Sequence, residues 1–171
     1  MGDQQCLDAI IAGTISGAFE DDEVCELKQY AFYGCNLLTS VSLPNCKKVK
    51  GHAFQGCTSL ASVSLPNCES VGELYEYGPF QGCTSLASVS LPKCAYIEDE
   101  SFEGCTSLVS LTLESPTMVT LHSSRAGYRP QTFDSTPIAS GNGTVYVPSD
   151  LVATYQANSY WSRFNIAAIQ A

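Results

Sequence analysis

The sequence predicts an α/β repeat fold, a solenoid whose coils stack through short parallel strands. The stretch FQGCTSLASVSLP occurs twice, at 54–66 and again at 80–92. Successive repeat phenylalanines are separated by 22, 26 and 22 residues, and each is followed three positions later by a cysteine and six positions later by a leucine. A fixed period with apolar residues at constant phases is typical of a repeat architecture. The four phenylalanines are Phe32, Phe54, Phe80 and Phe102.

The strand of each coil is predicted from the tripeptide V-S-L. In the second copy it is Val63-Ser64-Leu65, an alternation of apolar and polar residues that indicates one face inward. The proline that follows ends the strand, and the glycine before the first cysteine forms another corner. One such coil cannot bury enough apolar surface to fold alone, so the coils are expected to stack, with parallel strands about 4.8 Å apart.

Four segments are expected along the chain. Residues 1–19 form an N-terminal cap segment, in which Leu7, Ile10 and Ile11 cover the first coil. Residues 20–121 hold the repeats, of which one has the longer period of 26, and residues 122–143 form an irregular excursion. Residues 144–171 supply the last strand and a C-terminal helical cap, with Ser149 or Asp150 as its N-cap. The last coil is expected to be closed by Leu151, Tyr155, Trp161 and Phe164.

The phases spell L-x-x-[VL]-x-L-x-x-C, as in 60–68, together with A-F-x-G-C-x-x-L. This combination resembles the BspA-like leucine-rich repeats of bacterial surface proteins and of some protozoa. The stretch 144–166, TVYVPSDLVATYQANSYWSRFNI, resembles the C-terminal cap of such arrays. The resemblance implies a right-handed leucine-rich-repeat solenoid with an irregular or helical-turn convex side. It also implies a bacterial surface protein acting in adhesion or protein binding.

The chain is cysteine-rich, with nine cysteines and only two histidines. It has no C-x-x-C pair, which removes the usual zinc spacings, and we expect no metal and no other cofactor. Disulfides between stacked coils would need local distortion, because equivalent side chains point the same way. The favoured interpretation is reduced, buried thiols that pack as small apolar groups. These structural thiols are Cys35, Cys46, Cys57, Cys68, Cys83, Cys94 and Cys105.

The formal net charge of −9 argues against nucleic acid and anionic membrane surfaces as partners. No apolar run is long enough for membrane insertion. The first residues show no secretion signal, so localisation stays open. The resemblance implies a cell-surface or secreted protein, whereas free cysteines also fit an intracellular or anaerobic setting. A chain that forms the C-terminal part of a longer protein would also lack the signal.

The outward strand positions are all hydroxyl residues, expected on the concave face. Without aromatic or arginine anchors, this stripe predicts a solvated surface, with a weakly bound glycan as the alternative. The stripe comprises Ser40, Ser42, Ser62, Ser64, Ser88, Ser90, Ser110 and Thr112. At the turns, Lys47 is expected to pair with Glu69 and Glu26 with Lys48. The acidic run 98–100 lacks EF-hand spacing and is expected to be a solvated turn.

The candidate partner contacts lie where the repetition fails. The four-residue insertion in the third repeat carries tyrosines, and the excursion carries tyrosine and arginine, which are common anchors at interfaces. The alternative is that these tyrosines fold back on the coil edge. The candidates are Tyr75, Glu76, Tyr77, Arg125, Tyr128 and Arg129. The function predicted is a non-enzymatic binding or adhesion module for a protein or surface ligand. The alternative is a structural spacer or assembly module of a larger surface or particle protein, with no ligand of its own.

Overall fold

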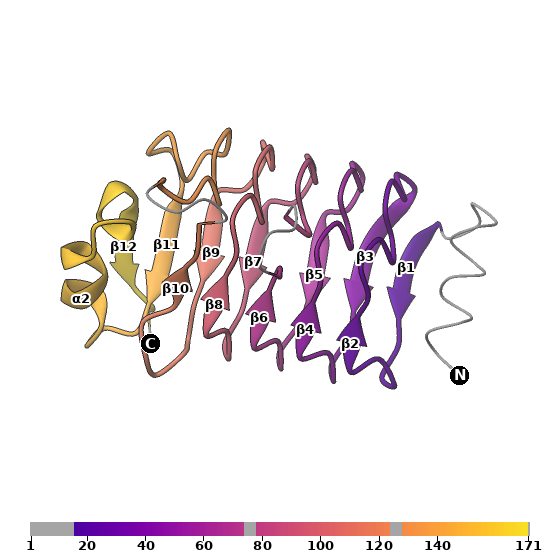
Figure 1. Cartoon of the computed structure of the whole chain (residues 1–171), viewed down its shortest axis with the longest axis horizontal. Coiled ribbons are helices and arrows are strands. Elements are labelled where there is room, and N and C mark those ends of the chain that lie inside the picture. The colour runs from indigo at the N-terminus through magenta and orange to yellow at the C-terminus, as the bar shows by residue number, and fades with distance from the viewer. Residues whose placement is uncertain (1–15, 74–77, 124–127, 171) are drawn as a thin grey trace.

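The computed structural model describes residues 16–73, 78–123 and 128–170. The coils stack along one axis, so that each coil adds one strand to a continuous parallel sheet (Figure 1). This sheet has seven strands in the order β1-β3-β5-β7-β9-β11-β12. The predicted solenoid of parallel strands is therefore confirmed. The strands are β1 (Gly17–Glu20), β3 (Leu38–Ser42), β5 (Ser62–Ser64), β7 (Ser88–Ser90), β9 (Ser110–Thr112), β11 (Thr144–Val147) and β12 (Asn165–Ala168).

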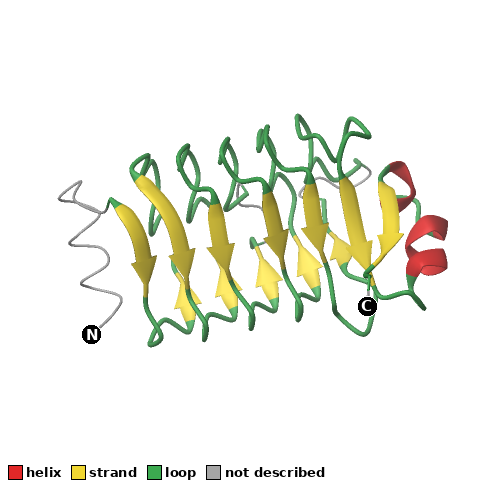
Figure 2. Ribbon diagram, turned by 180° about the vertical axis from the view of Figure 1, so that it is seen from behind, coloured by secondary structure: helices red, strands yellow, loops and turns green. Residues whose placement is uncertain are grey.

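A second parallel sheet lines another side of the stack, where the family resemblance implied irregular or helical turns (Figure 2). Its five strands have only two residues each, with the second residue buried and in register from coil to coil. Two residues are too few for an alternation to be recognised, which is why the sequence did not predict this sheet. The strands are β2 (Glu26–Leu27), β4 (Lys48–Val49), β6 (Ser70–Val71), β8 (Tyr96–Ile97) and β10 (Thr120–Leu121).

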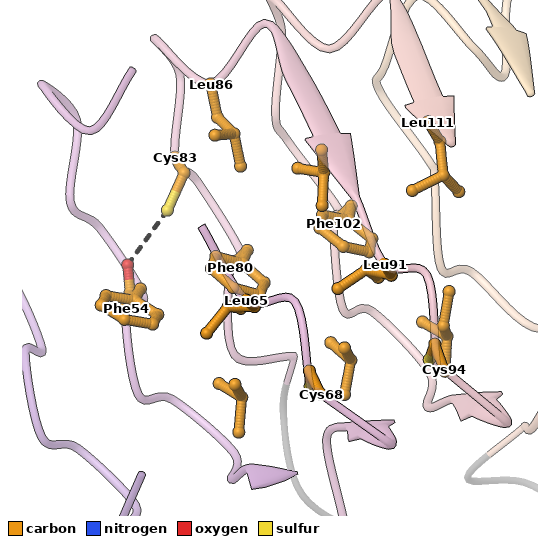
Figure 3. Packing of buried hydrophobic residues seen from close by; sticks show 14 of the residues in the cluster. Phe54, Leu65, Cys68, Phe80, Cys83, Leu86, Leu91, Cys94, Phe102 and Leu111 are labelled. Carbon is orange, nitrogen blue, oxygen red and sulfur yellow. Dashed lines mark hydrogen bonds between the residues drawn. The ribbon is translucent and has the colours of Figure 1, made fainter. Parts of the chain in front are cut away.

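The core lies between the two sheets and is organised around a column of stacked phenylalanines (Figure 3). Phe32, Phe54, Phe80 and Phe102 are fully buried, and successive ring centroids are 5.1–5.3 Å apart with nearly parallel planes. Because phenylalanine occupies the same position in each of these coils, each ring contacts the equivalent ring of the next coil. The leucine positions are equally buried, whereas Val63 is only partly so.

The segment 122–143, expected as an irregular excursion, contains a further coil turn in its described part. Phe133 stacks on Phe102 at 5.7 Å, and the backbone N–H of Phe102 donates to the carbonyl of Thr132. The amide of Phe80 bonds to Ser101 in the same way one coil earlier. In the sequence, T-F-D-S-T at 132–136 corresponds to S-F-E-G-C at 101–105. In this last copy a threonine replaces the cysteine, and Phe133 follows Phe102 by 31 residues rather than 22.

The two ends differ from expectation. Residues 17–19, assigned to the N-terminal cap, belong to β1 and pair with β3, whereas Leu7, Ile10 and Ile11 lie outside the described residues. At the C-terminus, α2 (Val152–Ala157) has six residues, and its N-cap residue is Leu151, without a side-chain cap bond. A 3-10 turn, η1 (Trp161–Arg163), follows, and the chain then returns as β12 beside β11, so that 144–147 is not the last strand.

Candidate functional site

The outward hydroxyls of the seven-stranded sheet form in-register columns. Ser40 is opposite Ser62, Ser88 is opposite Ser110, and Ser90 is opposite Thr112. These side chains are half-buried or exposed. The stripe presents small hydroxyl groups. On the next strand, β11, the aromatic Tyr146 is in register with Thr112. Whether the stripe binds anything stays a prediction.

The cysteines form two columns inside the stack. In the first, each thiol donates to the carbonyl oxygen of the phenylalanine one coil earlier, as Cys83 does to Phe54 at 3.1 Å (Figure 3). Cys57 and Cys105 make the same bond to Phe32 and Phe80. In the second column, Cys46, Cys68 and Cys94 each donate, at 3.2 Å, to the carbonyl two residues ahead. All six of these cysteines are buried, and Cys35 is half-buried.

Several of the buried thiols are held in their neutral form. Burial raises the pKa of both Cys57 and Cys94 to about 12. The pKa of Cys83 is raised by the neighbouring thiol of Cys105 and then by burial. Since the thiolate is the nucleophile and the metal ligand, these groups are inert as presented. Within residues 16–73, 78–123 and 128–170, all eight cysteines are unpaired, and no group of three or more His, Cys, Asp or Glu side chains could hold a metal ion.

The described residues that precede the two non-repeating segments lie on one edge of the solenoid. Val71, Ile97 and Leu121 are partners in the five-stranded sheet, so the residues that follow them start from equivalent places in three successive coils. The two segments that interrupt the repeat follow the first and the third of these coils in the sequence. We call this side the insertion edge, defined by the described residues 28–33, 50–55, 72–73, 78–81, 98–103, 122–123 and 128–134. Candidates Tyr75, Glu76, Tyr77 and Arg125 lie outside the described residues.

Two further candidates, Tyr128 and Arg129, are placed by the structure. Tyr128 is 66% exposed, the most exposed large hydrophobic side chain among the described residues. Arg129 makes two hydrogen bonds to the carboxylate of Asp134, at 2.9 and 3.0 Å. Partial burial raises the pKa of Asp134, but the bond and the charge of Arg129 outweigh it and leave this pKa lowered. Tyr128 is thus presented outward, and Arg129 is held within the chain.

The acidic run between the two insertions is not the solvated turn expected from its composition. Glu98 and Asp99 are buried, and they hold the two ends of residues 122–131. Glu98 Oε1 lies 2.7 Å from Nδ1 of His122, whose ring stacks on Tyr96 at 5.4 Å. Asp99 Oδ1 accepts from the backbone N–H of Gln131 at 2.6 Å. The carboxylates are used inside the fold because they tie the longest non-repeating segment to the preceding coil.

At the other end of the edge lies an aromatic cluster that the sequence did not single out. Tyr30 stacks on His52 with centroids 4.4 Å apart, and Tyr33 meets Tyr30 edge-on at 5.6 Å. Tyr30 and Tyr33 are 48% and 54% exposed. The signal that could have found them is phase: Tyr30 and His52 both lie two residues before a repeat phenylalanine.

The charged turns show one expected pair and one exchange of partner. Lys47 and Glu69 lie 3.6 Å apart, which confirms that pair. Glu26 is in register with Lys48, but its carboxylate bonds Lys28 at 2.9 Å and Lys50 at 3.1 Å instead. Glu26 thus joins Lys28 of its own coil to Lys50 of the next coil.

No helix among the described residues has both the length and the apolar character to cross a membrane. A comparison with curated proteins found no match. Among solved structures, the chain is similar to the leucine-rich repeat protein TpLRR of T. pallidum. Identity is 29%, the TM-score is 0.59, and the match covers 75% of this chain and 57% of that one.

Two further solved structures share the fold. A leucine-rich cell surface protein of Faecalibacterium prausnitzii is 22% identical, with a TM-score of 0.52 over 69% of this chain and 35% of that one. A leucine-rich repeat protein of Bacteroides ovatus is 21% identical, with a TM-score of 0.51 over 92% and 46%. The chain thus spans little more than half the length of the first of these proteins and less than half that of the other two.

The family model for the BspA type leucine-rich repeat region matches six copies over residues 21–126. This range contains the phenylalanine stack from Phe32 to Phe102, both cysteine columns and the strands β2 to β10. It covers more than half of the chain. The chain therefore belongs to the BspA-type leucine-rich repeat family.

Proposed function

We propose that this chain is a non-enzymatic binding module that recognises a protein or surface ligand through its insertion edge. Leucine-rich repeats of this family are a protein-interaction or surface-type module. The observation that carries the proposal is that exposed tyrosines share the insertion edge. They are Tyr30, Tyr33 and Tyr128, although Tyr30 and Tyr128 are 98 positions apart in the sequence.

The rest of the molecule supports this choice by contrast. The sheet face carries short hydroxyl side chains, and interface hot spots favour Tyr, Trp and Arg. The six thiols of the two cysteine columns are buried, and burial raises the pKa of Cys57 and Cys94, so these groups are poorly suited to act as nucleophiles. A solenoid scaffold with variable groups on one edge is a common design for recognition, because loops on a rigid frame carry function.

The proposal is tested by probing a peptide display library and a glycan array with three proteins. One is the wild-type chain, the second carries Tyr75→Ala, Tyr77→Ala and Tyr128→Ala, and the third carries Ser64→Lys and Ser90→Lys on the sheet face. We expect binders that the edge variant loses by about tenfold or more and that the sheet-face control retains. Binding that only the sheet-face control loses would place recognition on the hydroxyl stripe. A chain that selects nothing from either collection would favour the spacer alternative.

A further inference from the structure

Two arginines come together with one carboxylate at the C-terminal end of the insertion edge. Phe133 and Phe164 meet edge-on, with ring centroids 5.3 Å apart. Asp134 follows the first of these phenylalanines in the sequence, and Arg163 precedes the second. Arg129 is bound to the carboxylate of Asp134 through both of its terminal nitrogens. The three charged side chains therefore belong to one cluster around the contact between the two rings.

The guanidinium group of Arg163 is fixed from two sides. Its Nε donates to the carbonyl of Tyr160 at 3.1 Å, and its Cζ lies 5.1 Å from the centre of the Phe164 ring. Arg163 is nonetheless an exposed residue. A guanidinium held in one place loses less conformational entropy on binding, and its terminal nitrogens match the two oxygens of a carboxylate.

The electrostatics of this cluster favour a carboxylate. Partial burial lowers the pKa of Arg163, and the positive charge of Arg129 lowers it further, whereas Asp134 acts in the opposite direction. Partial burial raises the pKa of Asp134, but the bond and charge of Arg129, with a contribution from Arg163, leave it lowered. The two guanidinium groups therefore repel each other, and a carboxylate beside them relieves that repulsion.

Exposed tyrosines flank the two arginines. Tyr128 directly precedes Arg129, and Tyr160 supplies the carbonyl to which Arg163 is bound. Both tyrosines are exposed. Tyrosine and arginine are among the side chains that contribute most to protein interfaces. We call this group the arginine patch, defined as Tyr128, Arg129, Asp134, Tyr160 and Arg163.

We propose that the arginine patch binds an acidic segment of a partner protein. One glutamate or aspartate of that segment binds Arg163 beside Arg129, and an apolar residue next to it packs on Tyr128. A protein is favoured as the partner because exposed arginine and tyrosine together are typical of protein interfaces. This inference rests on the proposed function for its choice of edge, and it names the chemistry of the partner.

The test follows the arginine Nε–H signals by two-dimensional NMR while synthetic peptides in a Gly/Ser background are added. The first peptide has Leu-Glu-Leu at its centre, the second has Leu-Gln-Leu, and the third has Ser-Glu-Ser. We expect the first to bind the wild-type chain at least about fivefold more tightly than either of the others, and to shift the signal of Arg163. Binding should weaken as salt is raised, because the main contact is an ion pair.

Substitutions of Arg163 and Tyr128 assign the two contacts. Arg163→Gln should weaken binding of the first peptide by about fivefold to tenfold, and Arg163→Lys should weaken it less, because lysine keeps the charge but loses the paired nitrogens. Tyr128→Ser should weaken binding of the Leu-Glu-Leu peptide and leave the Ser-Glu-Ser peptide unchanged. Lys93→Gln, at an exposed basic residue elsewhere, is the matched control. Circular dichroism checks that each variant is folded.

Asp134→Asn should have the opposite effect. It removes the carboxylate that competes inside the chain for Arg129, so the acidic peptide should bind about threefold more tightly. A cluster with a purely structural role would show no such gain. This variant and Tyr128→Ser keep the test decisive even if Arg163→Gln fails to fold.

Three outcomes would overturn the inference. They are equal affinity for the glutamate and glutamine peptides, unchanged affinity in a folded Arg163→Gln variant, and no gain in Asp134→Asn. An oligogalacturonate that binds more tightly than the acidic peptide, and is lost in Arg163→Gln, would assign the patch to an acidic saccharide instead. The wider proposal is separable. Library binders that the triple tyrosine variant loses and Arg163→Gln retains would keep the insertion edge as the site without the arginine patch.

Discussion

The buried carboxylate of Glu98 and the imidazole of His122 hold two successive coils together, with Oε1 and Nδ1 2.7 Å apart. The Glu98 side chain is 4% exposed, whereas that of His122 is 37% exposed. Removing one partner therefore has unequal consequences. A carboxylate left buried without its imidazole loses more than an imidazole that water can reach.

We expect His122→Ala to lower the free energy of unfolding by about 3 kcal/mol and Glu98→Gln by about 1 kcal/mol, because glutamine keeps an acceptor oxygen. The same order should appear in the rate of trypsin cleavage at Arg125 or Arg129, since both lie in the segment that the pair anchors. Urea denaturation and limited proteolysis measure the two effects. Glu114→Gln, an exposed carboxylate elsewhere, is the control. Equal cleavage rates in all four proteins would show that Glu98 and His122 do not anchor the segment.

The thiol of Cys83 should contribute both packing and a hydrogen bond, because it is fully buried and donates to Phe54. Cys83→Ala removes both and is expected to cost about 2 kcal/mol. Cys83→Ser keeps a donor of similar size and should cost less than the alanine variant. Cys25→Ala, at an exposed position, should change stability by less than about 0.5 kcal/mol. Thermal and urea unfolding compare the three. A serine variant less stable than the alanine variant would mean that the carbonyl of Phe54 gains nothing from a donor here.

Constant phase explains what the sequence could predict. Phe32 to Phe102 and the cysteines recur at fixed offsets, so their common burial follows from stacking alone. Phe133 was missed because Ser135 and Thr136 replace the glycine and cysteine that mark the turn. Ser135 nonetheless keeps the positive φ, +61°, that Gly104 has in the preceding coil. The Tyr30–His52 stack also follows from constant phase, whereas the contacts of Glu98 depend on where the chain returns after the second non-repeating segment. Composition does not determine that return, so a run of acids by itself predicts a solvated turn.

Alkaline pH should destabilise the fold through its buried thiols. The pKa values of Cys57 and Cys94 are raised from 9.0 to about 12 by burial, so the folded state keeps protons that the unfolded chain loses. Their contribution to stability is complete below about pH 9 and is lost as pH rises from about 9 to 12. Unfolding free energies measured across that range should fall less steeply in a Cys57→Ala, Cys94→Ala variant than in the wild type. Both proteins contain the same tyrosine and lysine residues, so the difference between their two stability curves reports on the thiols. Two parallel curves would contradict the assigned protonation.

Substitution of a phenylalanine in the column should destabilise the fold most at the middle of the column. Phe80 has stacked rings on both sides, Phe54 at 5.1 Å and Phe102 at 5.3 Å. Phe80→Ala is expected to cost about 4 kcal/mol, from lost burial and the cavity left behind. Leu37→Ala, at a side chain that is 60% exposed, should stay within about 0.5 kcal/mol of the wild type. Denaturant midpoints compare them. A Phe80→Ala protein as stable as Leu37→Ala would show that the stack relaxes around the gap.

The C-terminal residues satisfy the backbone of Val119, which lies beside β10, where the five-stranded sheet ends. The Val119 N–H donates to the hydroxyl of Tyr155 at 2.8 Å, and its carbonyl accepts from Trp161 Nε1 at 2.7 Å. The two side chains thus replace the strand that a further coil would provide.

Tyr155→Phe leaves a buried N–H without a partner, and Trp161→Phe leaves a buried carbonyl. We expect each substitution to lower the free energy of unfolding by about 1–3 kcal/mol.

Amide hydrogen exchange distinguishes this effect from simple loss of packing. Tyr155→Phe removes the acceptor of the Val119 amide and should speed the exchange of that amide beyond the change in global stability. Trp161→Phe removes a contact to the carbonyl only, so at matched stability it should affect that amide less. Tyr160→Phe, at an exposed ring, is the control. Val119 exchange that tracks global stability alone in both variants would mean that these bonds do not close the solenoid.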